Sequence, residues 1–351
     1  MDAQKIPATV VTGFLGAGKT TLIRNLLATA NGKRIALIIN EFGDLGVDGD
    51  VLAGCGDETC TEDDIVELNN GCICCTVADD FVPTMEALLA REARPDHIVI
   101  ETSGLALPQP LVDAFNWPQI RERVSVDGVV TVVDAAAVAD GRFAHDQHAV
   151  AAQRAADEAL DHEAPLEELF EDQINCADMV VVTKTDLVDG DAMAKVEHEV
   201  RHATARKIAV VRSAEGRAPG ADILLGLGVG SEADLDARRS HHELHHADGH
   251  EHDHDEFESI VVEGAAVAEP EALVARLRDA IEAHDVLRLK GFVAVDGKPM
   301  RLVVQAVGSR IQTYFDRPWR ADEDRASRLV VIGLHDWDEA GVRRDVEAAL
   351  G

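Results

Sequence analysis

Short apolar runs alternate with helix-like stretches along the first 215 residues. The runs are apolar along nearly their whole length, at residues 6–12, 34–39, 64–68, 97–101, 126–134, 179–183 and 207–212. Helical spacing of apolar positions occurs between several of them, for example at residues 81–93, 145–161 and 193–203. Strands of this kind are typical of a mostly parallel sheet covered by helices on both faces. We therefore expect an α/β, doubly wound fold that binds ligands beyond the carboxyl ends of its strands.

The pattern changes near residue 226. The next stretch is rich in Gly, Asp and His and lacks apolar periodicity, which predicts a flexible linker. A smaller α+β domain should follow, with a hairpin around Asp296-Gly297, a strong turn signal. Its expected strands are residues 260–262, 287–295, 300–307, 311–315 and 329–334, and its expected helices are residues 271–283 and 339–350. The predicted domains are residues 1–225, a linker at 226–257, and residues 258–351.

Composition narrows the class of protein. The chain has 351 residues, with 33 basic against 65 acidic side chains and a formal net charge of −32. This charge disfavours nucleic acid and anionic membranes as partners, since no basic patch is apparent. No apolar run approaches the roughly 20 residues of a membrane span, and the first residues do not form a signal peptide. We therefore expect a cytoplasmic protein with six reduced cysteines, so clustered cysteines indicate metal ligands or redox groups.

Residues 13–20, the phosphate loop, have the sequence Gly-Phe-Leu-Gly-Ala-Gly-Lys-Thr and lie between the first apolar run and a helix-prone stretch. A strand aims such a loop at a phosphate, and the N-terminus of the next helix faces the anion. Lys19 supplies positive charge to the β- and γ-phosphates, and the Thr20 hydroxyl binds Mg²⁺. The motif predicts a P-loop NTPase sheet, with Gly13, Gly16, Ala17, Gly18, Lys19, Thr20 and Thr21 around the nucleotide.

Residues 183–186, the base loop, have the sequence Thr-Lys-Thr-Asp and follow another apolar run. The Asp186 carboxylate accepts hydrogen bonds from guanine N1–H and the exocyclic amine, which adenine does not offer in that arrangement. The stem of Lys184 covers the base, and Thr183 stands where GTPases more commonly have Asn. Ser213, after the next run, is expected to contact the guanine oxygen through its backbone. In the alternative interpretation, Asp186 is a helix N-cap and Lys184 is solvated.

Two further segments fit sensors of the γ-phosphate. Glu101 ends an apolar run, where P-loop enzymes place a carboxylate that organises Mg²⁺. Gly104 lets a backbone N–H approach the γ-phosphate, so this segment responds when the phosphate leaves. Residues 40–43 follow the second run in the same way. Glu41 either contacts Mg²⁺ through water or is a solvated acid. Lys19, Glu101 and Gly104 are the predicted catalytic residues.

Cysteines and histidines suggest a second site, for a transition metal. Cys72, Cys74 and Cys75 lie within four residues, and thiolates bind Zn²⁺ and Co²⁺ with an open fourth position. A buried apolar cluster and a redox pair are the alternatives. Cys176 fits the core, and Cys55 and Cys60 are candidate auxiliary ligands. Seven linker histidines, either auxiliary ligands or part of a soluble spacer, are His241, His242, His245, His246, His250, His252 and His254.

With the phosphate loop, Asn-Glu-Phe-Gly, Cys-Ile-Cys-Cys, Glu-Thr-Ser-Gly and Thr-Lys-Thr-Asp in this order, the chain resembles the CobW family of P-loop GTPases, related to UreG and HypB. The resemblance covers most of residues 1–215 and the C-terminal unit. It implies a metallochaperone of cobalamin biosynthesis that uses GTP and Mg²⁺ to load a metal. The resemblance favours Co²⁺ as that metal, with Zn²⁺ as the alternative. The metal goes to a client enzyme, with cobaltochelatase as one candidate, and a homodimer is one candidate assembly. The alternatives are a P-loop metabolite kinase and a nucleotide-regulated metal buffer or sensor.

Overall fold

The computed structural model describes residues 5–30, 32–39, 65–67, 81–91, 93–144, 146, 148, 150–152, 166–217, 219–225, 257–320, 323–335 and 337–351. These residues belong to two compact units, an N-terminal unit within Lys5–Leu225 and a C-terminal unit within Gly226–Gly351. Each unit has its own hydrophobic core. Among the described residues, no helix combines the length and the apolarity that a membrane crossing requires.

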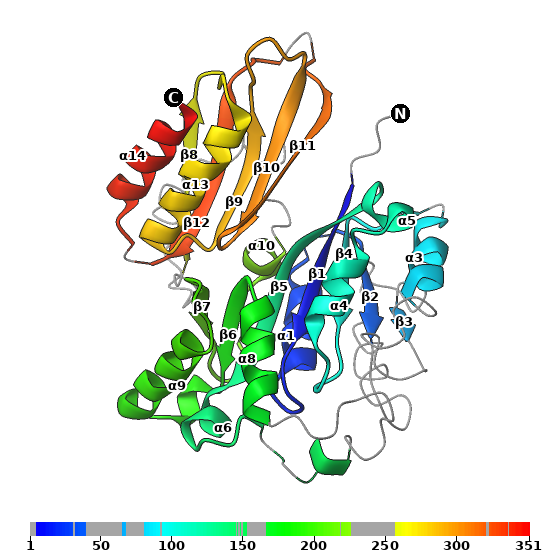
Figure 1. Ribbon diagram of the computed structural model, residues 1–351, viewed down its shortest axis with the longest axis vertical. Coiled ribbons are helices and arrows are strands. Elements are labelled where there is room, and N and C mark those ends of the chain that lie inside the picture. The colour runs from blue at the N-terminus through cyan, green and yellow to red at the C-terminus, as the bar shows by residue number, and fades with distance from the viewer. Residues whose placement is uncertain are drawn as a thin grey trace. The chain divides into compact units, whose positions relative to one another are not determined.

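A parallel sheet forms the centre of the N-terminal unit, in the order β3-β2-β4-β1-β5-β6-β7 (Figure 1). The predicted doubly wound sheet is therefore confirmed. Every predicted run contains a strand, and most bounds agree within two residues. The strands are β1 (Ile6–Thr12), β2 (Ile35–Ile39), β3 (Ile65–Glu67), β4 (His97–Glu101), β5 (Val124–Asp134), β6 (Met179–Thr183) and β7 (Ala209–Arg212).

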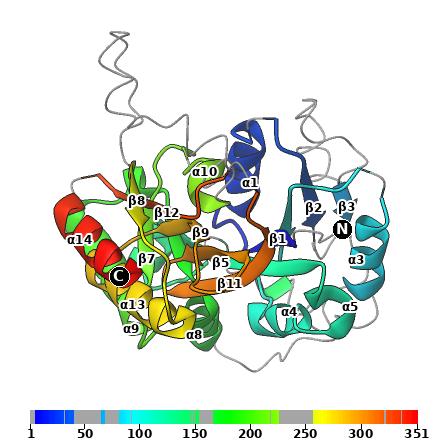
Figure 2. The same cartoon turned by 90° about the horizontal axis from the view of Figure 1, so that it is seen from above.

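Helices cover both faces of this sheet. Helix α1 lies on one face, and α3, α4 and α8 lie on the other (Figure 2). The buried side of α1 is formed by Leu22, Ile23, Leu26 and Leu27. The helices are α1 (Lys19–Ala28), α3 (Val82–Leu89), α4 (Pro108–Ala114), α5 (Pro118–Arg121), α6 (Ala135–Ala139), α8 (Leu166–Cys176), α9 (Gly190–His202) and α10 (Ala221–Leu224), with a 3₁₀ turn η3 (Thr185–Leu187).

Two helix boundaries differ from the prediction for local reasons. Helix α3 ends at Leu89 rather than at residue 93, and Pro95 disfavours helical geometry at the residue before it. Helix α9 begins at Gly190, three residues before the expected start at 193, because the Asp189 side chain caps it by accepting from Ala192 N at 2.8 Å. Of the helix expected at 145–161, the described residues 148 and 150–152 are helical.

The C-terminal unit is an antiparallel sheet in the order β11-β10-β9-β12-β8, with α13 and α14 packed on one face (Figure 1). This confirms the predicted α+β domain. Strands β9 and β10 pair as the expected hairpin, and Gly297 in its turn has a φ of 70°. The elements are β8 (Phe257–Gly264), α13 (Pro270–His284), β9 (Arg288–Val293), β10 (Met300–Val307), β11 (Arg310–Pro318), β12 (Ser327–Leu334) and α14 (Glu339–Leu350).

Candidate nucleotide-binding site

The predicted nucleotide residues gather at one edge of the parallel sheet. Strands β4, β1, β5 and β6 are neighbours in that order, and all run in the same direction. Their carboxyl ends therefore lie side by side. The phosphate loop leaves β1, while Glu101, Asp134 and Thr183 are the last residues of β4, β5 and β6. The fold thus brings three sequence-distant segments to the phosphate loop.

The phosphate loop curls around the side chain of Lys19, the first residue of α1. The Lys19 Nζ donates to the carbonyl oxygens of Gly13 at 2.9 Å and Phe14 at 3.2 Å, and the side chain is buried. Gly13 has a φ of +134°, and a Cβ atom there would lie 2.2 Å from the Val132 carbonyl oxygen. Only glycine fits this position, because the clash is with backbone of the neighbouring strand. The loop therefore places an ammonium group at the start of a helix, where an anion is favoured.

Thr20 and Glu101 lie together beside the phosphate loop. The Thr20 hydroxyl donates to Glu101 Oε1 at 3.3 Å, and Glu101 is 7% exposed. A hydroxyl and a carboxylate are the oxygen ligands that Mg²⁺ prefers, so this donor pair fits that ion. The segment after β4 also touches the loop, since a Cβ atom on Gly104 would lie 2.6 Å from the Leu15 backbone nitrogen.

A residue that the sequence analysis missed holds this segment from the other side. Gln173 on α8 is buried, and its Nε2 donates to the carbonyl oxygens of Gly104 and Ala106, each at 3.3 Å. Gln173 lies 69 residues from Gly104 in the chain, and no local motif marks it. The segment predicted to sense the γ-phosphate is therefore fixed between the phosphate loop and α8.

The base loop is tied to the phosphate loop by two side chains. The Thr183 hydroxyl contacts the carbonyl oxygens of Ala17 at 2.6 Å and Val133 at 3.2 Å. The bracing that an Asn would provide is thus supplied by a shorter side chain. Lys184 Nζ donates to the Gly16 carbonyl oxygen at 2.8 Å and forms an ion pair with Asp134. Lys184 has left-handed backbone angles, with φ 57° and ψ 33°.

Asp186 and Ser213 join the base loop to the segment after β7. Asp186 Oδ1 accepts from Glu215 N at 2.8 Å. The Ser213 carbonyl oxygen accepts from Thr185 N at 3.2 Å and from the Thr185 hydroxyl at 3.1 Å. Asp186 lies inside the turn η3, and Asp189 is the residue that caps α9. The alternative interpretation of Asp186 as a helix N-cap is therefore wrong.

Asp134 is a second residue that the sequence analysis did not assign. It is 1% exposed, caps α6 through Oδ1, which accepts from Ala137 N at 3.1 Å, and pairs with Lys184. An acid at the carboxyl end of the strand next to β1 was the available signal. An acid at this position also fits an ordinary helix N-cap, so the signal does not separate the two roles.

The predicted transition-metal ligands lie outside the described residues. This holds for Cys55, Cys60, Cys72, Cys74 and Cys75 and for the seven linker histidines, and Glu41, the candidate for Mg²⁺, lies outside the described residues as well. Cys176 is described, and its burial in the core confirms the prediction for it. Within the described ranges, no group of three or more His, Cys, Asp or Glu side chains is arranged to hold a metal ion.

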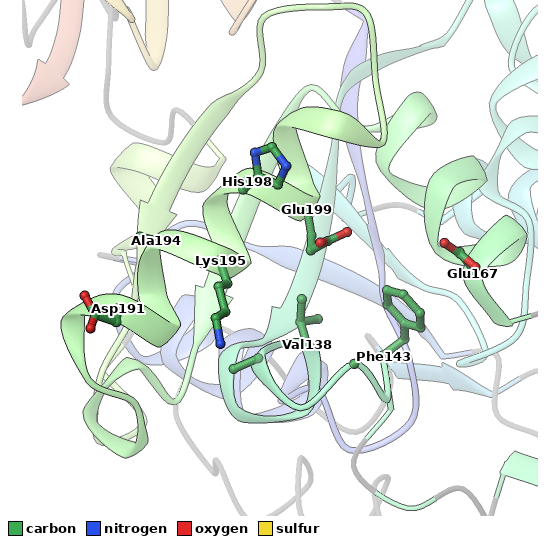
Figure 3. Close-up of a pocket in the computed structure, with 10 residues that line it drawn as sticks. Val138, Phe143, Glu167, Asp191, Ala194, Lys195, His198 and Glu199 are labelled. Carbon is green, nitrogen blue, oxygen red and sulfur yellow. The ribbon is translucent and has the colours of Figure 1, made fainter.

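A hollow of about 600 Å³ lies elsewhere on the N-terminal unit, between α6, α8 and α9 (Figure 3). Val138 and Phe143 form apolar parts of its wall, and Lys195, His198 and Glu199 line it from α9. It contains none of the predicted nucleotide residues. The nucleotide site is therefore defined by the loops at the sheet edge.

Comparison with known proteins gives matches along almost the whole chain. The nucleotide-binding domain of CobW, HypB and UreG matches residues 7–212, and the cobalamin synthesis protein CobW C-terminal domain matches residues 257–350. The chain is 66% identical to the zinc chaperone CobW of Sinorhizobium sp. over 346 residues, covering 99% of this chain and 98% of the relative. It is 50% identical to the zinc chaperone CobW of Pseudomonas aeruginosa, covering 99% and 92%. The crystal structure of Zn(II)-bound YjiA GTPase from E. coli is 26% identical over 99% of both chains, with a TM-score of 0.38.

Proposed function

We propose that this chain, which belongs to the CobW family, is a GTP-hydrolysing metallochaperone that loads a divalent transition metal and passes it to a client protein. The observation that carries the nucleotide part is the convergence of the phosphate loop, Glu101 and the base loop at one sheet edge. A P-loop metabolite kinase would use Lys19, Thr20 and Glu101 as well. It would leave the thiols and Asp186 without a role, so we favour the GTPase.

In the proposed mechanism, Lys19 leaves its two carbonyl partners and binds the β- and γ-phosphates, which supply stronger, charged acceptors. Thr20 and Glu101 hold Mg²⁺, which neutralises phosphate charge when it is bound. A Cβ atom on Gly104 would clash with the Leu15 backbone, so glycine lets this segment lie against the phosphate loop, where its backbone N–H would respond to the γ-phosphate. Asp186 accepts the two guanine N–H groups and thereby selects GTP over ATP.

We propose that the metal is Zn²⁺ rather than Co²⁺. Two relatives that match almost all of this chain are named zinc chaperones, whereas the preference for Co²⁺ came from the resemblance to a cobalamin-related family. Three thiolates, from Cys72, Cys74 and Cys75, accept either ion. The Cys-Ile-Cys-Cys site, a role in cobalamin biosynthesis, cobaltochelatase as the client, the homodimer and the cytoplasmic location all stay predictions.

Coupling between the two sites is the central part of the proposal. The thiols lie in sequence between residues 40–43 and Glu101–Gly104, the two segments expected to sense the γ-phosphate. A γ-phosphate that orders both segments would constrain the thiols from either side. Mg-GTP should therefore raise the metal affinity above that measured with Mg-GDP. By thermodynamic linkage, the metal must favour GTP by the same factor, typically about 5- to 150-fold.

The test is a titration of the full-length protein with Co²⁺, followed by thiolate charge-transfer absorbance, with Mg-GTP, with Mg-GDP and without nucleotide. A competition with Zn²⁺ then ranks the two ions. Substituting Ser for Cys72, Cys74 and Cys75 should erase the coupling and leave nucleotide affinity unchanged, because no thiol contacts GTP in the proposal. The matched control is Cys176→Ala, which removes a thiol that is buried in the core and is not a proposed ligand. Equal metal affinity in all three nucleotide states would contradict the metallochaperone and support a passive metal buffer.

A further inference from the structure

We infer that Asp134 is a positioning residue for guanine recognition, acting through Lys184. This inference rests on the proposed nucleotide function and deepens it. Asp134 does not belong to the phosphate loop or to the base loop, and it lies at the end of the strand between them. It is nevertheless joined to the base loop, because its carboxylate forms the ion pair with the Lys184 ammonium group.

The two oxygens of Asp134 have separate partners. Oδ1 accepts from the backbone N–H of Ala137 at 3.1 Å and caps α6, while Oδ2 pairs with Lys184 Nζ. The Asp134 side chain is 1% exposed and that of Lys184 is 29% exposed. Removing a carboxylate from water is costly unless a charge and hydrogen bonds compensate it. A neutral residue could cap α6 equally well, so capping alone does not account for a buried charge here.

The effect of this pair is to fix the path of a flexible side chain. A lysine side chain has a flexible stem of four carbons, and the ammonium group at its end is a point charge without directional preference. In this protein the ammonium group contacts two acceptors, the Asp134 carboxylate and the Gly16 carbonyl oxygen at 2.8 Å. The stem therefore extends from the base loop to the phosphate loop. Lys184 also keeps left-handed backbone angles, which a non-glycine residue adopts only when its surroundings hold it.

A guanine bound by Asp186 would lie beside this stem, since Asp186 is two residues further along the same loop. The fixed stem provides an apolar surface for the ring. Without Asp134, the ammonium group would lose its charged partner and turn toward water or the phosphates. Asp134 would thus raise nucleotide affinity without touching the nucleotide.

The experiment uses the full chain and separates the two roles of Asp134, its charge facing Lys184 and its hydrogen bond that caps α6. Asp134→Asn keeps an oxygen for Ala137 N, because Asn is as good an N-cap as Asp, and removes the charge that faces Lys184. Asp189→Asn is the matched control, since Asp189 caps α9 through the same kind of bond to Ala192 N. We measure the Kd of fluorescent GDP, the GTP-to-ATP affinity ratio by competition, and Tm. The expected result for Asp134→Asn is a loss of about tenfold or more in GDP affinity, with a lower GTP-to-ATP ratio. Asp189→Asn should change neither value.

A double variant guards against simple loss of folding. Lys184→Met alone leaves a buried carboxylate without its cation and should lower Tm. Adding Asp134→Asn removes that charge and should restore Tm, while the GDP affinity stays as low as in Lys184→Met. Restored affinity in the double variant, or an unchanged Kd and ratio in Asp134→Asn, would overturn the positioning role. Failure of the parent protein to prefer GTP over ATP would instead refute the proposed function itself.

Discussion

Replacing Asp186 by Asn tests the base specificity most directly, because the structure fixes how the new side chain should sit. Asp186 Oδ1 accepts from the backbone N–H of Glu215 at 2.8 Å. In the Asn variant, the amide oxygen must keep this partner, since an amide N–H₂ facing a backbone N–H would be repulsive. The N–H₂ group therefore takes the place of the second carboxylate oxygen, which the proposed mechanism directs at guanine N1–H and the exocyclic amine.

The magnitude follows from this exchange. A hydrogen bond to a charged group contributes about 1.5–3 kcal/mol, and donors would now face donors. We expect GTP binding to weaken by about 2–4 kcal/mol, which is roughly 30- to 1000-fold in Kd. ATP does not use these acceptors, so its affinity should stay within about threefold of the parent value. Xanthosine triphosphate carries a carbonyl where guanine carries the amine, and it should gain affinity because the Asn N–H₂ donates to that oxygen.

The assay is displacement of fluorescent GDP by GTP, ATP, inosine triphosphate and xanthosine triphosphate. Inosine lacks the exocyclic amine, so the parent protein should bind it less tightly than GTP and the variant should discriminate less. Asp189→Asn is again the control, because it removes the same charge three residues away. An unchanged GTP-to-ATP ratio would remove Asp186 from base recognition. An equal loss for GTP and ATP would mean that the loop had collapsed and that the effect was not one of specificity.

Two further predictions concern the phosphates and the C-terminal unit. Lys19→Ala should abolish tight GTP binding and turnover, because its ammonium group is the proposed partner of the phosphates. The control Lys195→Ala, at an exposed lysine, should leave both intact. GTP hydrolysis at the parent rate in Lys19→Ala, measured by phosphate release, would contradict the phosphate-loop assignment. Burial alone would raise the pKa of Glu323, but the hydrogen bonds from the Arg317 side chain and the Arg320 backbone, together with the charges of Arg317 and Arg301, outweigh it and lower the pKa from 4.5 to about 2. Because the pKa is lower in the folded state than in the unfolded state, this stabilisation is present above pH 4.5 and is lost as the pH falls toward 2. Glu323→Gln should therefore destabilise the protein by about 1–2 kcal/mol at pH 7. The difference in unfolding free energy between parent and variant, measured with urea, should vanish at low pH. A difference that does not change with pH would assign the effect to packing.

The sequence predicted the strands well because burial on both faces makes a strand apolar throughout. The bounds of β1 and β4 agree with the predicted runs at 6–12 and 97–101. Helix ends were less accurate, since they depend on single contacts. The bond from Ala192 N to Asp189 starts α9 early, and apolar spacing carries no information about such a cap.

The residues of the candidate site were also predicted unevenly from the sequence. Motifs identified the phosphate loop and the base loop because their residues are contiguous and each has a chemical reason for its spacing. Asp134 and Gln173 were missed because their partners are 50 and 69 residues away. A contact between distant segments follows from strand order and helix placement, and the sequence alone did not provide those.

Thr183 shows how the site works as a unit. An Asn at this position would brace the phosphate loop with an amide, yet here a hydroxyl reaches the Ala17 carbonyl oxygen at 2.6 Å. The next residue, Lys184, donates to the Gly16 carbonyl oxygen. Two adjacent carbonyls of the phosphate loop are thus tied to two adjacent residues of the base loop, so a shift of one loop must strain the other. In the proposed function, binding of the base would therefore also stabilise the phosphate loop. The segment around Gly104 lies against the phosphate loop and accepts hydrogen bonds from Gln173, so in the proposed function a change in the nucleotide would reach α8 through this segment.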